Sequence, residues 1–176
     1  MFAAFLLFSM LVEAELSPPE LKKTTIENLW SSEYEKTTLK DLTGQKIKWL
    51  SRKNKKVVVI NLWATWCSAC VTEMPNFEKL YKKFEKDKDI TFMFVTDENE
   101  EEINNFLKEK YFYLPICTVD SGKFPITEHH MNVNNGRIPA TYIIVPESDE
   151  VYIHIGAAQW DDEGVVDFIK KLLKAP

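Results

Sequence analysis

The sequence predicts a single α/β domain in which helices pack against a central β-sheet. Apolar and β-branched runs alternate along the chain with segments whose apolar residues recur at helical spacing. The 176 residues are 45% hydrophobic and 28% charged, which suits one globular domain with a substantial core and argues against disorder. Because the formal charge is −5, the chain has no basic excess for nucleic acid, and we expect protein or small-molecule partners.

The N-terminus has features of an export signal. An apolar run extends from Phe2 to Val12, and Val12-Glu13-Ala14 has the small-x-small form of a signal-peptidase site. The run is too short to span a bilayer, and polar residues follow it at once. A buried helix is the alternative, because no Lys or Arg precedes the run. We predict a signal peptide over residues 1–14 and one domain over residues 15–176, with membrane tethering if the leader is not cleaved.

The strands of the predicted sheet follow in order. Residues 37–49 are typical of a short hairpin that turns at Leu42-Thr43-Gly44-Gln45. Residues 57–63 form a continuous apolar and β-branched run, which indicates a central strand covered on both faces. Further strands are predicted over residues 90–95, 114–119, 140–145 and 151–155, and a turn at residues 146–149 joins the last two.

Three helices are predicted among these strands. From Cys67 to Phe84, apolar residues recur at intervals of three and four, and Pro75 is expected to kink this helix. The acidic run over residues 97–102 opens the second helix, where its charges complement the helix dipole; this explanation is preferred to a calcium site. The final helix begins at residues 161–163 and ends in a lysine-rich turn.

The chemistry-bearing segment is a Cys-x-x-Cys pair at the junction between the central strand and the first helix. Two intervening residues let the sulfurs of Cys67 and Cys70 meet within one helical turn. The free N–H groups and the dipole at the helix start favour the thiolate of the first cysteine. Cys67 is therefore predicted to be the nucleophile and Cys70 the resolving thiol.

Half of a zinc site is the alternative explanation of the pair. A stable zinc site needs four ligands, and only Cys117 and three histidines remain. His129 and His130 are adjacent, hence on different faces of a helix, and His154 lies within a predicted strand. We therefore expect no metal. Cys117 is expected to be a buried, inert thiol rather than a regulatory one.

Two separate motifs resemble a known family. The run from Asn61 to Pro75 is similar to the active-site segment of the thioredoxin superfamily, specifically its TlpA/ResA branch of exported thiol-disulfide oxidoreductases. Gly136-Arg137-Ile138-Pro139-Ala140-Thr141 resembles the loop that places a cis-proline opposite the cysteines in that family. The resemblance implies a thioredoxin fold, with a central mixed β-sheet flanked by helices, an N-terminal hairpin and a central insertion, which we assign to residues 99–113.

The resemblance also assigns roles to individual residues. It implies that Cys67 attacks a substrate disulfide and that Cys70 resolves the mixed disulfide. Pro139 would shape the substrate groove, and Ile138 would offer backbone groups to the substrate chain. Trp66 is placed at this groove as a rim aromatic, an explanation that we prefer to a specific substrate contact.

Glu73 is the candidate proton acceptor. Thioredoxin has a buried Asp six residues before its first cysteine, whereas this chain has Asn61, which cannot accept the proton. Glu73 lies three residues after Cys70 and resembles a Glu that the TlpA/ResA branch keeps near its cysteines. We expect it to be close to the Cys70 sulfur, partly desolvated and raised in pKa. A solvated helix glutamate is the alternative.

The function implied by the resemblance is thiol-disulfide exchange with protein disulfides, as a reductase. Apocytochrome c is one implied substrate, in cytochrome c maturation, and the periplasm or another extracytoplasmic space is the implied location. An upstream thiol-disulfide protein would donate electrons, and no cofactor is expected. The Ser68-Ala69 pair tunes the reduction potential, so the family name does not fix the direction of electron flow. The alternatives are a non-catalytic module that binds an extended chain and a thiol peroxidase.

Overall fold

A central mixed sheet organises the chain. The computed structural model describes residues 16–26, 29, 37–48, 55–121 and 124–175, and the predicted leader lies outside them. Eight strands form one sheet in the order β1-β8-β7-β4-β5-β6-β2-β3. β4 (Val57–Leu62) is parallel to β5 (Ile90–Thr96) and antiparallel to β7 (Ala140–Val145). The prediction that this apolar run forms a central strand is therefore confirmed.

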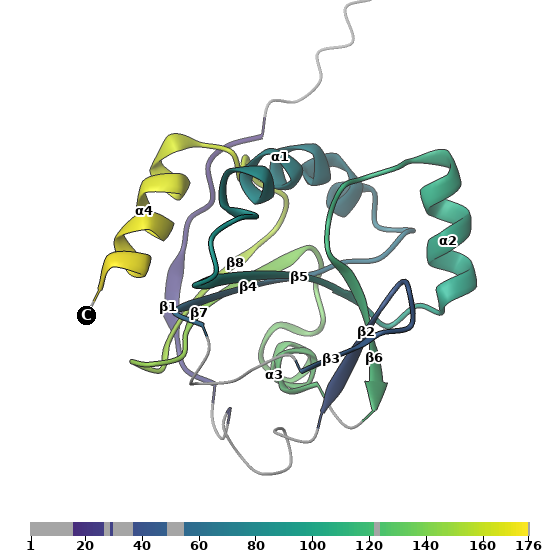
Figure 1. The fold of residues 1–176 in the computed structure, drawn as a ribbon, viewed down its shortest axis with the longest axis horizontal. Coiled ribbons are helices and arrows are strands. Elements are labelled where there is room, and N and C mark those ends of the chain that lie inside the picture. The colour runs from purple at the N-terminus through teal and green to yellow at the C-terminus, as the bar shows by residue number, and fades with distance from the viewer. Residues whose placement is uncertain (1–15, 27–28, 30–36, 49–54, 122–123, 176) are drawn as a thin grey trace, which may run out of the picture.

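Helices cover both faces of the sheet (Figure 1). α1 and α4 lie on one face and α3 lies on the other, while α2 packs through Ile103 in the same core as α1 and α4. α3 and β1 were not predicted. The remaining bounds are β1 (Lys22–Thr24), β2 (Thr38–Asp41), β3 (Lys46–Lys48), β6 (Ile116–Ser121), β8 (Glu150–Ile155), α1 (Ser68–Phe84), α2 (Glu100–Glu109), α3 (Pro125–Asn134) and α4 (Glu163–Lys174).

The alternation of side chains along β4 sorts its residues between two cores. Val57 and Val59 pack in the cluster that includes α1 and α4, while Val58 and Ile60 pack in the cluster on the α3 face. Successive strand residues point to opposite faces, so Asn61 shares the face of Val59 and is directed towards α1. A buried polar side chain is thereby placed directly under the helix that carries the cysteines.

α1 is anchored by a nearly continuous buried face. Phe77 is fully buried, stacks on Trp160 at a ring-centroid distance of 4.5 Å and meets Phe94 edge-on at 5.0 Å. The helix passes through Pro75 as one element, and the expected kink there stays a prediction. Its buried residues are Cys70, Glu73, Met74, Phe77, Leu80 and Phe84.

The predicted N-terminal hairpin is present at one edge of the sheet. β2 and β3 pair antiparallel, and β2 also pairs antiparallel with β6. Asp41 Oδ1 accepts hydrogen bonds from the backbone N–H groups of Thr43 and Gln45, each at 2.9 Å. Gly44 has a φ of 82°, a left-handed conformation that glycine adopts without strain. Local turn chemistry therefore sets the register of this hairpin.

α2 begins later than the acidic run suggests. Asn99 is its N-cap, and the Asn99 and Glu102 side chains each accept a hydrogen bond from the other residue's backbone N–H. Asp97 and Glu98 precede the helix, so the prediction that the whole run opens it is wrong at these two positions. α2 lies within the stretch 99–113, where the insertion was expected, and Ile103 is its one buried residue.

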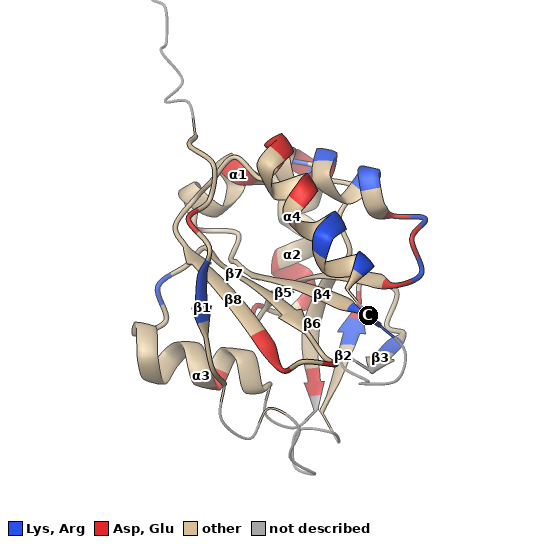
Figure 2. Cartoon of the chain, turned by 90° about the vertical axis from the view of Figure 1, so that its left-hand side faces the viewer, with Lys and Arg blue, Asp and Glu red and all other residues tan. Residues whose placement is uncertain are grey.

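Charged residues of both signs lie along α1 and α4 (Figure 2), and on α4 the acidic residues come first and the lysines last. Lys79 pairs with Asp161 at 3.0 Å, and Lys83 pairs with Glu163 at 2.7 Å, joining α1 to the start of α4. Exposed pairs of this kind contribute about 0–1 kcal/mol, so the buried contacts hold the two helices in place. Among the described residues, no helix has the length and apolar content needed to cross a bilayer.

Truncation of Ile103 is expected to loosen α2. Ile103→Ala should lower the free energy of unfolding by about 2–5 kcal/mol, because it leaves a cavity under the single buried anchor of this helix. Urea denaturation followed by circular dichroism measures the change. Asn105→Ala, on the exposed side of the same helix, is the matched control and should change stability by less than about 0.5 kcal/mol.

Candidate active site

Cys67 and Cys70 form a disulfide at the N-terminus of α1. Their sulfur atoms are 2.09 Å apart. Cys67 is the N-cap residue of α1, and the backbone N–H of Cys70 donates to its sulfur at 3.2 Å. Cys67 is 7% exposed and Cys70 1% exposed, so an incoming group reaches Cys67 more readily. This geometry supports Cys67 as the attacking thiol, since helix N-terminal N–H groups stabilise a thiolate.

The loop before the disulfide is fixed by Glu98. The Glu98 carboxylate accepts from the Thr65 backbone N–H at 2.7 Å and from the Thr65 hydroxyl at 2.5 Å. The Thr96 hydroxyl also donates to Glu98 at 3.1 Å. Trp66, held between Thr65 and Cys67, is 75% exposed, as expected for a rim aromatic, whereas Trp63 is buried. The sequence explained Glu98 as a helix-start charge and so missed its role in this loop.

The second loop at the site leads into β7 through a cis peptide bond between Ile138 and Pro139, so the predicted cis bond is confirmed. Pro139 is buried, and its carbonyl accepts from the Gly156 N–H at 2.9 Å. Ile138 and Trp66 line one pocket of about 370 Å³, together with Met131 of α3. Two of the three predicted substrate-binding residues therefore meet at one pocket, and Pro139 adjoins it in the chain.

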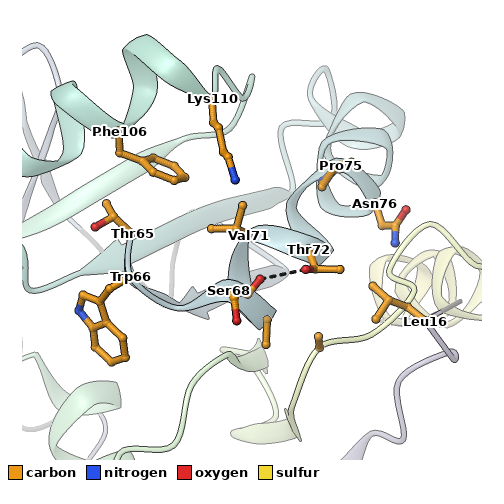
Figure 3. Close-up of a pocket in the computed structure, with 12 residues that line it drawn as sticks. Leu16, Thr65, Trp66, Ser68, Val71, Thr72, Pro75, Asn76, Phe106 and Lys110 are labelled. Atoms are coloured by element: carbon orange, nitrogen blue, oxygen red, sulfur yellow. Dashed lines mark hydrogen bonds between the residues drawn. The ribbon is translucent and has the colours of Figure 1, made fainter. Parts of the chain in front are cut away.

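A larger groove of about 1070 Å³ lies on the outer side of the α1 N-terminus (Figure 3). Thr65 and Trp66 border it at the disulfide loop, and Phe106 and Lys110 approach it from α2 and its end. Leu16 borders it from the N-terminal segment. Trp66 lines both this groove and the pocket at Ile138, so it separates two concave surfaces next to the disulfide.

Glu73 is buried with three hydrogen-bond donors, and its expected closeness to the Cys70 sulfur stays a prediction. It is one helical turn after Cys70 on the buried side of α1. Asn61 Nδ2 donates to its Oε1 at 2.9 Å, while the Ala158 N–H and Trp160 Nε1 donate to its Oε2 at 3.0 and 2.8 Å. A solvated helix glutamate is therefore excluded, since Glu73 is 1% exposed.

Burial raises the pKa of Glu73 from 4.5 to about 7. Loss of water disfavours the charged carboxylate, and the hydrogen bonds from Trp160, Ala158 and Asn61 oppose this effect only in part. The group can therefore exchange a proton near neutral pH. A carboxyl with this pKa is suited to general acid–base catalysis.

Strand register connects Glu73 to the cis-proline loop. Asn61 lies opposite Thr141 in the β4 and β7 pairing, and its Nδ2 donates to the Thr141 hydroxyl at 3.0 Å as well as to Glu73. Asn61 was predicted only as a residue that cannot accept a proton. Its role as a shared donor was missed, along with those of Trp160 and Thr141, because no local motif connects these positions.

The third cysteine stands apart from this site. Cys117 lies on β6 and is 1% exposed, and burial raises the pKa of its thiol to about 12. It is therefore protonated and shielded, which agrees with the expected inert thiol. Across the described parts of the chain, no group of three or more His, Cys, Asp or Glu residues is arranged to hold a metal ion.

A disulfide at a helix start, packed against a mixed sheet beside a cis-proline loop, is the arrangement of thioredoxin-like proteins, and solved structures agree. A thioredoxin-related protein from Neisseria meningitidis serogroup B superposes with a TM-score of 0.59 and 23% identity, over 76% of this chain and 98% of that one. StoA from Bacillus subtilis gives a TM-score of 0.53 and 22% identity, over 78% and 95%. These likenesses confirm the predicted thioredoxin fold.

Residues 25–169 match the Redoxin family, and the chain belongs to that family. It is 32% identical over 117 residues to the thiol-disulfide oxidoreductase ResA of Bacillus cereus (strain ZK / E33L), an alignment that covers 66% of this chain. The chain spans 64% of that relative's length, which is less than two thirds. It is also 31% identical over 121 residues to the thioredoxin-like protein YneN of Bacillus subtilis (strain 168), over 68% of this chain and 67% of that protein. The resemblance inferred from the two motifs is confirmed.

The raised pKa of Glu73 predicts how stability depends on pH. Between pH 4.5 and about 7 the folded protein keeps a proton on Glu73 that the unfolded chain has released. The stability due to this group therefore falls as pH rises through that window, by about 3 kcal/mol in total. In Glu73→Gln this component should be absent. Urea unfolding of both proteins at several pH values measures the difference, and parallel pH profiles would contradict the assignment.

Proposed function

We propose that the protein is a thiol-disulfide oxidoreductase that reduces disulfides of protein substrates. The observation that carries this proposal is the Cys67–Cys70 disulfide at the start of α1, followed one helical turn later by a buried carboxyl, Glu73, whose pKa is about 7. Relatives named thiol-disulfide oxidoreductases support it. The proposal assigns catalytic roles to Cys67, Cys70 and Glu73.

The reaction begins with the reduced pair. The Cys67 thiolate attacks one sulfur of the substrate disulfide, forms a mixed disulfide and releases the other substrate sulfur as a thiolate, which takes up a proton. Cys70 then gives its proton to the Glu73 carboxylate and attacks the Cys67 sulfur. The Cys67–Cys70 disulfide forms, and the second substrate sulfur leaves and is protonated. The substrate gains two electrons, which an upstream dithiol protein restores to the pair.

The substrate chain is proposed to lie along the pocket that Trp66 and Ile138 share. Its neighbour Pro139 is buried, so the loop presents its backbone and the Ile138 side chain at the pocket that Trp66 also lines. An extended substrate segment could pair with that backbone. An extracytoplasmic location, with apocytochrome c as one candidate substrate, is proposed on the apolar leader and the family resemblance.

Two other functions remain testable alternatives on the same fold. A binding module would hold an extended chain without turnover, and a thiol peroxidase would be oxidised by peroxide. A buried Glu73 one helical turn after Cys70 supports exchange, because resolution of a mixed disulfide needs a proton acceptor for Cys70. Oxidised insulin and hydrogen peroxide, offered to the reduced protein in parallel, separate the three functions. Oxidation of the Cys67–Cys70 pair by insulin supports the proposal, oxidation by peroxide alone indicates a peroxidase, and oxidation by neither indicates a binding module; the last two results overturn the proposal.

Cysteine substitution should separate attack from resolution. Cys70→Ser should accumulate a mixed disulfide on Cys67, because attack survives while the resolving thiol is missing. Cys67→Ser should lose exchange entirely. Mass mapping of adducts formed with a disulfide-bridged peptide gives the answer, with Cys117→Ser as the matched control. Adducts at Cys70 or Cys117 would overturn the assignment.

Glu73→Gln should slow release of the mixed disulfide more than its formation. General-base help contributes about 10²- to 10⁴-fold, so a loss of tenfold or more is expected in the resolution step. In the native protein that step should accelerate as pH rises through about 7, because Glu73 must be ionised to accept the proton. Stopped-flow kinetics across this range should show no such inflection in the variant. Glu85→Gln, at the exposed end of α1, should retain it.

A further inference from the structure

We propose that His130 of α3 is the positioning residue for the loop that ends in Pro139, and that it sets how well this loop receives a substrate chain. The proposal rests on the proposed function, because it concerns the loop that the substrate would contact. The ring partners of His130 are Tyr142, Arg137 and Asn134, and its proposed role is not contact with the reacting sulfurs. It acts by fixing the backbone of the loop between α3 and β7.

His130 contacts the loop through its ring and its backbone. Ring Nε2 lies 2.6 Å from the carbonyl oxygen of Arg137, two residues before Pro139. The His130 carbonyl also accepts from the N–H groups of Asn135, in the left-handed cap of α3, and of Gly136 at 3.4 Å. One residue therefore contacts three consecutive positions of the loop.

The chemistry of the partners fixes which ring nitrogen carries the proton. A carbonyl oxygen can only accept, so Nε2 is the protonated nitrogen that donates to Arg137. Nδ1 then accepts from the Tyr142 hydroxyl at 2.9 Å, and Asn134 Nδ2 lies 3.4 Å away. Burial lowers the pKa of His130, which favours this neutral form. Since His130 is 1% exposed, water cannot replace either partner without local opening.

The position of Tyr142 makes this contact rigid. Tyr142 is fully buried on β7 and lies opposite Ile60 of β4, so its hydroxyl is fixed by the central sheet. Gly136 has a φ of 63°, and a Cβ atom added there would lie 2.4 Å from the Met131 sulfur. The loop is therefore also packed closely against α3. The His130 ring therefore holds the Arg137 carbonyl, just before Ile138 and Pro139, at a fixed position relative to β7.

The experiment compares His130→Leu, which removes the ring donor, with His130→Gln, whose amide can still donate to Arg137. Loss of one such hydrogen bond corresponds to about a three- to tenfold change. In His130→Leu, amide exchange at Gly136 and Arg137 should accelerate by that factor, while β5 amides are unchanged. KM for oxidised insulin should rise by about three- to tenfold with kcat within about twofold. His130→Gln should restore both quantities towards wild type.

His129→Gln is the matched control. His129 is the next residue of α3, and its ring meets Tyr142 edge-on at a centroid distance of 6.2 Å. The His129→Gln variant should leave amide exchange at Gly136 and Arg137 and the KM for oxidised insulin unchanged. If His130→Leu does not fold, Tyr142→Phe is used instead, because it removes the donor to Nδ1. It should also accelerate amide exchange in the loop and raise the KM for oxidised insulin.

Three results would overturn the inference. Unchanged exchange at Gly136 and Arg137 in the variants would show that His130 does not hold the loop. A fall in kcat with unchanged KM would show that the loop position does not govern substrate binding. Failure of His130→Gln to restore the loop would show that ring volume, rather than the donor, matters. If the unaltered protein does not reduce insulin, the proposed function fails, and the exchange measurement alone decides the role of His130.

Discussion

A buried carboxyl group is the constraint on which the rest of the site depends. Glu73 needs hydrogen-bond donors that water cannot supply, because an unpartnered buried carboxyl costs several kcal/mol, about the size of a domain's whole stability. Its donors come from β4, through Asn61, and from the segment after β8, through Ala158 and Trp160. Both elements must therefore dock against α1 before Glu73, the proposed proton acceptor for the Cys70 thiol, has its hydrogen-bond donors. Folding and the proposed chemistry depend on the same contacts.

The two loops that flank the disulfide are positioned in the same way. Each has little regular structure of its own, and each is held by a side chain that lies outside the loop itself. Glu98 holds the loop at Thr65, and His130 holds the loop at Arg137. The disulfide thus lies between segments whose backbones are fixed, while Trp66 at the rim remains exposed. Fixed loops beside one exposed aromatic residue are compatible with the proposed binding of an extended substrate chain.

Local patterns predicted the parts of the fold that local physics determines. The β4 run, the amphipathic α1 and the Cys-x-x-Cys spacing each lie within one segment, and each was recognised. α3 was missed because its buried residues are few and include His130, so no apolar stripe marks it. The role of Glu98 was missed because its partner, Thr65, is 33 residues away. Hydrogen bonds between distant segments follow from strand register, which a single sequence does not display.

The start of β7 limits where residues can be inserted near this site. Thr141 and Tyr142 are consecutive, yet they point to opposite faces, one bonded to Asn61 beneath α1 and the other to His130 of α3. An insertion of one residue between Pro139 and Thr141 would exchange these two faces and disconnect both partners at once. The exposed turn at 147–149 faces no such restriction. Length variation should therefore accumulate at the far end of β7, while its first residues keep a fixed count from the proline.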